Sequence, residues 1–176
     1  MLAYLQGLSL GLAYVAPIGV QNLFVINAGL SQPRAAAYRT ALIVIFFDVT
    51  LALAGFFGIG ALIEHSELIR KGVLLAGSLV VMYMGLRLML SREVAGPAIN
   101  VNIPLMKTIG MACVVTWFNP QAIIDVSLLL GSFRVALPPE ESGLFLWGVV
   151  CASCLWFLSL TTISSLFKNR FTPRLL

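Results

Sequence analysis

Residues 2–30 read LAYLQGLSLGLAYVAPIGVQNLFVINAGL, and this stretch contains no Asp, Glu, Lys or Arg. Because a helix rises about 1.5 Å per residue, the stretch is long enough to cross the roughly 30 Å hydrocarbon core of a membrane. It is longer than a straight crossing needs, and Pro17 lies near its middle. Proline removes a backbone donor and clashes with the preceding turn, so we expect the helix to break or kink there.

The rest of the chain has the same apolar character. Of its 176 residues, 60% are hydrophobic and only 10% are charged, and the mean hydropathy is +0.99. A soluble domain carries about a quarter charged residues, so the composition excludes a soluble globule. The pattern predicts an all-α polytopic membrane protein with five transmembrane helices. These lie at about residues 2–30, 40–63, 72–90, 108–133 and 142–167.

The basic residues are distributed unevenly between the two predicted sides of the membrane. Eight of the 11 fall on one side, namely Arg34, Arg39, Arg87, Arg92, Lys107, Lys168, Arg170 and Arg174. The other side holds Arg70, Lys71 and Arg134. The positive-inside rule therefore predicts an N-terminus outside and a C-terminus in the cytoplasm. As a partner of a membrane protein we expect lipid. Nucleic acid is not an expected partner, because the basic residues sit in short loops and form no stripe. A cleaved signal peptide is not expected, because residues 1–30 lack a basic n-region.

A second interrupted segment resembles the first. Pro120 lies in the fourth segment, and each proline is followed five residues later by a polar side chain, Asn22 or Asp125. An offset of three spans makes the two helices cross in opposite directions. A single domain, 1–176, with an incomplete 3+3 inverted repeat is predicted, its halves covering about residues 1–92 and 104–176. Transporters of this kind bind substrate between the broken helices. The alternative is that both prolines serve only helix packing.

Two acids lie inside predicted spans. Asp48 is about a third of the way along the second segment, and Asp125 follows Pro120 in the fourth. An ionised carboxylate in mid-membrane costs roughly 2.5–3.5 kcal/mol on insertion scales. Neither acid has a Lys or Arg nearby in its own segment to offset this cost. We therefore expect each to carry a proton or to balance a cationic substrate; a protonated, purely structural Asp is the alternative.

Amide side chains flank both breaks. Open helix N-termini after Pro17 and Pro120 would present backbone N–H groups suited to an α-carboxylate. With the two acids, such a site suits a zwitterion or a cationic amino acid. The predicted substrate-binding residues are Gln21, Asn22, Asp48, Asn119, Gln121 and Asp125, of which Asp48 and Asp125 are also candidates for proton coupling. The predicted helix breaks are at Pro17, Gly19 and Pro120.

The remaining patterns favour structural roles. Two glycine motifs, at residues 7–11 and 55–60, are typical of close helix packing. Cys151 and Cys154 form a Cys-x-x-Cys, but they lie in an uncharged segment without the flanks of a soluble redox fold. His65 stands alone, and a metal site needs several converging ligands. We expect no metal and no cofactor.

The motif PIGVQNL at residues 17–23, paired with WFNPQ at 117–121 and Asp125, resembles the lysine exporter (LysE/RhtB) family. The likeness covers essentially the whole chain, and the Gln-Asn pair is similar to the basic amino acid branch. The resemblance implies export of amino acids from the bacterial cytoplasm across the inner membrane, driven by the proton motive force. It implies functional roles for Pro17, Gly19, Gln21, Asn22, Asp48, Asn119, Pro120 and Asp125.

The chain departs from that family in two ways. Many members have a second proline where this chain has Val20, and the family usually continues into a sixth span, whereas this sequence stops at Leu176. Three alternatives remain for the missing span: it was lost to truncation, it is replaced by a partner in a homodimer, or it is dispensable.

The sequence thus predicts a proton-coupled exporter of basic amino acids, not an enzyme. The alternatives are efflux of another small cation or a metal ion, a membrane thiol–disulfide electron carrier, or a helical subunit without transport of its own.

Overall fold

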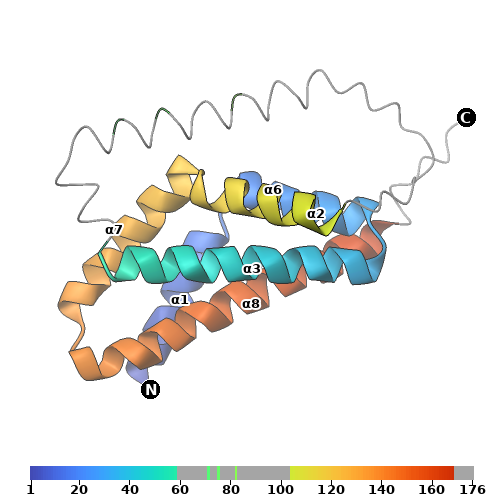
Figure 1. The fold of residues 1–176 in the computed structure, drawn as a ribbon. Coiled ribbons are helices and arrows are strands. Elements are labelled where there is room, and N and C mark those ends of the chain that lie inside the picture. The colour runs from blue at the N-terminus through green and yellow to red at the C-terminus, as the bar shows by residue number, and fades with distance from the viewer. Residues whose placement is uncertain (59–70, 72–74, 76–81, 83–103, 169–176) are drawn as a thin grey trace, which may run out of the picture.

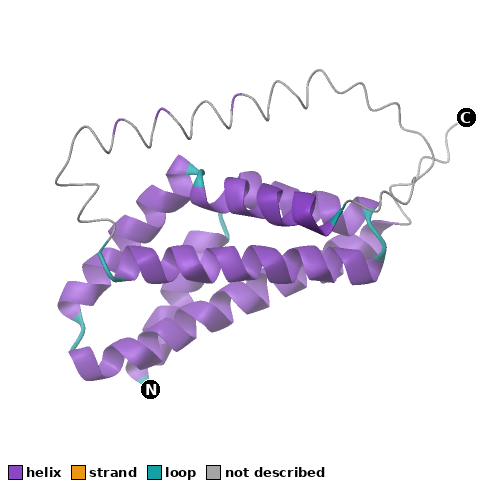
Figure 2. Cartoon of the chain, in the orientation of Figure 1, coloured by secondary structure: helices purple, strands orange, loops and turns teal. Residues whose placement is uncertain are grey.

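The computed structural model describes residues 1–58, 71, 75, 82 and 104–168 (Figure 1). The helices are α1 (Leu2–Val15), α2 (Val20–Ser31), α3 (Arg34–Phe56), α6 (Leu105–Trp117), α7 (Pro120–Ala136) and α8 (Ser142–Phe167), with a short 3-10 helix, η1 (Pro139–Glu141). Short loops join α1 to α2, α2 to α3, α6 to α7 and α7 to η1, and the described residues include no strand (Figure 2). The predicted all-α fold is confirmed. The predicted segment at residues 72–90, with His65, lies outside the described residues.

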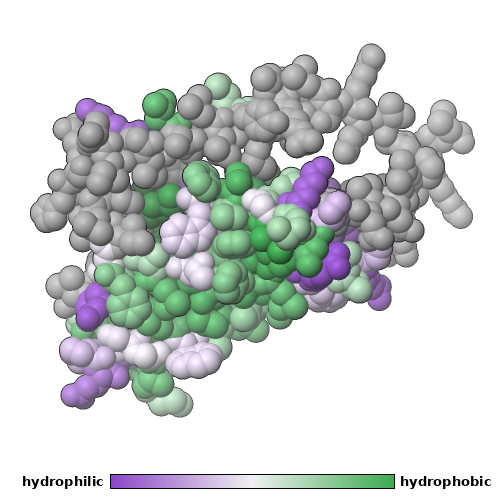
Figure 3. Space-filling model, in the orientation of Figure 1, coloured by the Kyte–Doolittle hydropathy of each residue, from purple (hydrophilic) through white to green (hydrophobic). Residues whose placement is uncertain are grey.

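The membrane crossings take two forms. Two described helices, α3 and the helix at Pro139–Phe167, are each long and apolar enough to span a membrane alone. The pairs α1–α2 and α6–α7 are bent by 80° and 57°, and each qualifies as one broken span. The predicted breaks near Pro17 and Pro120 are therefore confirmed. Figure 3 shows the resulting apolar band between two more hydrophilic ends.

The second spanning helix begins and ends earlier in the chain than the sequence predicts. Instead of covering residues 40–63, α3 begins at Arg34, directly after Pro33, and ends at Phe56. Pro33 is the N-cap residue of α3, with a φ of −58° and an extended ψ of 146°, and its carbonyl oxygen accepts from the backbone N–H of Ala37 at 3.0 Å. The long stems of basic residues let them occupy the ends of a spanning helix. At the other end, Gly58 has a φ of 110°, which turns the chain out of the helix. Asp48 consequently lies past the midpoint of α3.

The described helices run in two opposite directions. In Figure 1, α3 and α8 lie antiparallel, and the path from α6 to α7 runs opposite to the path from α1 to α2. Glycines bring α1 and α8 close together. A Cβ added to Gly7 would overlap the Phe145 carbonyl, and one added to Gly148 would overlap the Tyr4 carbonyl. The predicted packing role of Gly7 is thus confirmed.

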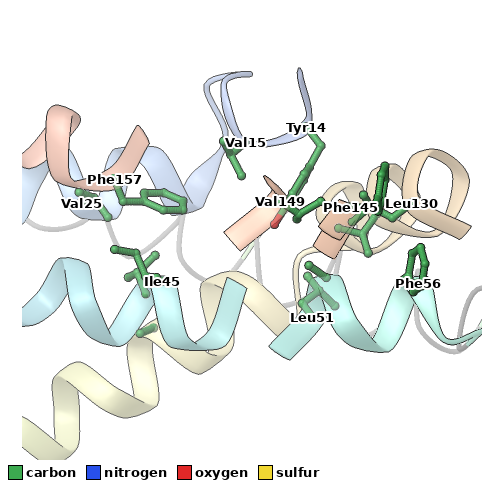
Figure 4. Packing of buried hydrophobic residues seen from close by; sticks show 14 of the residues in the cluster. Tyr14, Val15, Val25, Ile45, Leu51, Phe56, Leu130, Phe145, Val149 and Phe157 are labelled. Carbon is green, nitrogen blue, oxygen red and sulfur yellow. The ribbon is translucent and has the colours of Figure 1, made fainter. Parts of the chain in front are cut away.

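Aromatic rings fix one end of the bundle. The Phe145 ring of α8 stacks between Phe56 of α3 and Phe133 of α7, at centroid distances of 5.6 and 5.5 Å. The Arg134 guanidinium lies 5.8 Å from the Phe56 ring centre, a distance that allows a cation–π contact. Figure 4 shows how the buried apolar side chains from α1, α2, α3, α7 and α8 meet in this core.

The α1–α8 contact predicts a large difference between two glycines of α8. Gly148→Ala places a methyl group against backbone atoms that cannot rotate away, so we expect destabilisation by about 1–3 kcal/mol. Gly143→Ala, which meets no atom within 4 Å, is the matched control and should be neutral or stabilising. Thermal unfolding of the purified variants in detergent measures both effects. Equal melting temperatures would contradict the packing described here.

Candidate functional site

The first break is held open by the side chain of Asn22. Helix α1 ends at Val15 and α2 begins at Val20, so the break leaves carbonyl groups without helical partners. The Asn22 amide nitrogen donates to the carbonyl oxygens of Val15 at 2.9 Å and Pro17 at 2.7 Å. The Asn22 amide oxygen accepts from Trp156 Nε1 of α8 at 3.1 Å. Both donors of this amide are used within the protein, and they stabilise the bend.

The second polar cluster lies where α2, α3 and α8 meet. The carboxyl group of Asp48 is completely buried. One of its oxygens accepts from Gln21 Nε2 at 3.3 Å, and the other accepts from Ser153 Oγ at 2.5 Å. The buried Tyr14 hydroxyl of α1 also lies near this carboxyl group, without a hydrogen bond of good geometry. No Lys, Arg or His among the described residues contacts the acid, so its charge has no counter-ion within this part of the chain.

The second break has a different cap. Asn119 precedes α7, and its side-chain oxygen accepts from the backbone N–H of Gln121 at 3.2 Å. Proline at the first position of α7 has no N–H to satisfy. Gln121, the second residue of α7, donates from Nε2 to Oδ1 of Asp125, one turn further along the helix, at 2.8 Å. Asp125 is only half-buried, so its carboxylate keeps contact with the surroundings of the break.

The two breaks face one another. A Cβ added to Gly19 would lie 3.9 Å from Asn119 Nδ2, which is ordinary van der Waals contact. Trp117, at the end of α6, donates from Nε1 to Thr50 Oγ1 at 3.2 Å. This bond ties the second break to α3, two residues from Asp48. The N-termini of α2 and α7 therefore converge beside both acids.

These N-termini differ in what they offer a ligand. Gly19, which precedes α2, has extended φ and ψ of −116° and −174°, and no described side chain caps the helix. The first backbone N–H groups of a helix have no carbonyl partner within it. The start of α2 thus keeps donors for an anion, whereas Asn119 already occupies one donor of α7. The prediction that both N-termini are open is met by α2 alone.

The predicted site residues form two groups with separate surroundings. Gln21, Asn22 and Asp48 are buried together around the first break. Asn119, Gln121 and Asp125 lie around the second break, each at least partly exposed. The structure therefore separates a buried acid from an accessible one, which the sequence did not distinguish.

Two functional candidates were missed by sequence reasoning, both on α8. Ser153 contacts Asp48, and Trp156 contacts Asn22. Residues three apart lie on one face of a helix. A serine and a tryptophan at this spacing in an apolar segment therefore indicate a polar face, and the sequence shows this pattern. Cys151 and Cys154, on the same helix, are both free and half-buried.

A groove on the bundle surface lies apart from this site. It has a volume of about 330 Å³ between α3 and α6, and its lining is formed by Arg39, Leu42, Ile43, Phe46, Phe47 and Ile109. Because almost all of the lining is apolar, the groove fits the lipid-facing surface of a membrane protein, and none of the predicted site residues lines it.

Comparison with known proteins gives a consistent result. The family model described as "LysE type translocator" matches residues 12–175. The arginine exporter protein ArgO of Serratia proteamaculans (strain 568) is 32% identical over 166 residues, which cover 92% of this chain and 80% of that protein. ArgO of Escherichia coli (strain K12) is 32% identical over 177 residues, which cover 95% and 80% of the two chains. No solved structure gives a significant match.

The contacts of Asn22 predict that its charge-changing variant is unstable. Asn22→Asp replaces an amide donor by an oxygen facing two carbonyl oxygens. Leaving buried polar groups unsatisfied costs about 1–3 kcal/mol. Asn27→Asp makes the same substitution at an exposed position of α2 and should change the melting temperature little. Thermal unfolding of both variants tests the role of Asn22, which a comparable loss in the two would contradict.

Proposed function

The chain belongs to the LysE type translocator family, and from this premise we propose that it exports arginine or lysine through a site between the two helix breaks. Family membership makes it an amino acid exporter and not an enzyme. The finer proposal has three parts, namely a cationic substrate, proton coupling and alternating access. It is carried by one observation, the convergence of Gly19 and Asn119 beside two intramembrane acids.

The chemistry of the two breaks suits the two ends of a basic amino acid. The uncapped start of α2 provides backbone donors and the positive end of a helix dipole for the α-carboxylate. Asp125, half-buried beside the second break, provides a carboxylate for the guanidinium or ammonium group. Gln121 orients that carboxylate through its 2.8 Å hydrogen bond. Asn22 has both amide donors engaged in the bend, so we assign it to shaping the site rather than to direct substrate contact.

The buried acid is assigned to the coupled proton. Asp48 has zero exposed surface and joins α2, α3 and α8 through Gln21 and Ser153. Without a counter-ion among the described residues, its carboxyl group changes charge most readily by binding or releasing a proton. Since Gln21 lies directly after the first break, that change acts on the half-helix whose start would bind the substrate.

The opposite directions of the bent pairs support alternating access. Each described part of the chain contains a bent pair followed by a long helix, α1–α2 then α3 and α6–α7 then α8. This arrangement fits two inverted repeats that rock around a shared site. We propose that the repeats lie at about residues 1–92 and 104–176, as predicted from the sequence.

Charge at the two ends supports an orientation in the bacterial inner membrane. The starts of α3 and α6 lie at the same end of the bundle as the end of α8 (Figure 1), which places Arg34, Arg39, Lys107 and Lys168 there. The opposite end carries Arg134 together with Glu140 and Glu141. We propose that the more basic end faces the cytoplasm and that the N-terminus is outside.

Substrate charge provides the first test. Proteoliposomes preloaded with labelled arginine should release it when a pH gradient is imposed, and those loaded with citrulline, its neutral counterpart, should release far less. Asp125→Asn should reduce the preference for arginine about tenfold or more, because a charge-assisted hydrogen bond is lost. Unchanged preference in a well-folded Asp125→Asn protein would contradict this assignment.

Proton coupling provides the second test. Asp48→Asn should abolish release driven by the pH gradient, while exchange of labelled for unlabelled arginine continues, since a permanently neutral side chain cannot take up and release the proton. Gradient-driven release that survives this substitution would contradict the role of Asp48. Replacing Cys151 and Cys154 by Ser should leave both transport activities intact, whereas it would abolish the function of a thiol–disulfide electron carrier.

A further inference from the structure

Asp48 of α3 and Ser153 of α8 are in direct contact inside the bundle. Both side chains have zero exposed surface, and Ser153 Oγ lies 2.5 Å from Asp48 Oδ2. Ser153 Oγ also lies 3.4 Å from the Val149 carbonyl oxygen, one turn earlier in α8. A serine hydroxyl both donates and accepts, and its hydrogen can rotate between two acceptors.

The two neighbours of the carboxyl group differ in what they can do when it is protonated. Gln21 approaches Oδ1 with its amide nitrogen, which donates and cannot accept. Ser153 approaches Oδ2 with a hydroxyl group, which can turn its hydrogen toward Val149 and accept from the acid. Protonation at Oδ2 therefore keeps both contacts, whereas protonation at Oδ1 would break the bond to Gln21.

From these contacts we propose that Ser153 is a positioning residue that holds Asp48 Oδ2 in both protonation states and so sets the pH range of export. In the ionised state, Ser153 donates to Oδ2. When a proton from water binds Oδ2, the hydroxyl rotates, donates to the Val149 carbonyl and accepts from Oδ2–H; the reverse rotation accompanies release of the proton. This inference rests on the proposed function, because it requires Asp48 to carry the coupled proton.

No titratable or charged group among the described residues bonds the Asp48 carboxyl group as Ser153 does. Among the described residues, the titratable side chains that face Asp48 are Tyr14 from α1 and Cys154 from α8. Neither makes a hydrogen bond to the carboxyl group within the distance and angle expected of one. The described parts of α2, α6 and α7 place no charged group against it. Ser153 is thus the hydroxyl that bonds Asp48 directly.

The test compares two serines of the same helix. A hydrogen bond favours the ionised carboxylate more than the neutral acid, so Ser153→Ala should move the midpoint of the pH profile of arginine export about one pH unit higher. Ser153→Thr retains the hydroxyl group and should return the midpoint toward that of the unaltered protein, whatever its yield. Ser159→Ala, at an exposed position of α8, should leave the profile unchanged.

An unchanged midpoint in Ser153→Ala, or an equal shift in Ser159→Ala, would overturn the inference. A second measurement separates this failure from failure of the proposed function. The infrared carbonyl band of protonated Asp48, identified by its loss in Asp48→Asn, is titrated in purified protein without transport. If the unaltered protein shows no pH-dependent export, proton coupling fails, and the band still decides the role of Ser153. If the pH midpoint of this band is the same in Ser153→Ala as in the unaltered protein, the inference is overturned.

Discussion

A helix broken inside a membrane must satisfy the carbonyl groups that the break exposes, because hydrocarbon offers no water to do so. In this protein that constraint falls on Asn22, which bonds the carbonyl oxygens of Val15 and Pro17 and is held in turn by Trp156. The bend of 80° between α1 and α2 depends on these bonds. The bond from Trp156 also joins the first break to α8, the helix that carries Ser153 beside Asp48.

The two acids of the site differ in how deeply they are buried. Asp48 of α3 is enclosed by polar side chains from α2 and α8. A change in the charge of its carboxyl group therefore affects contacts among three helices. Asp125 stands beside the second break with one neighbour from its own helix. Asp48 is buried and bonded to neighbouring helices, whereas Asp125 is accessible and lies near open backbone donors. The two acids are therefore suited to different chemistry. Their separation allows the proposed proton and the proposed cationic substrate to be bound by different groups of one small site.

Much of the fold was predictable because membrane insertion imposes simple rules. The apolar segments, the two breaks and the close packing at Gly7 follow from segment length, proline chemistry and residue size. The bounds of α3 were predicted poorly, since hydropathy alone ignores that Arg34 and Arg39 extend a helix beyond its apolar part. The family was indicated by the motif around Pro17 and is confirmed by the match over residues 12–175.

The sequence by itself determined that the chain is an all-helical membrane protein, where its helices break and which acids lie in its apolar segments, because these depend on local composition and backbone chemistry. Only the tertiary structure decided which acid is buried and which side chains complete the site. Ser153 lies 105 positions from Asp48, and Trp156 lies 134 positions from Asn22. Such pairs are set by how antiparallel helices pack, and local pattern carries no information about which faces will meet.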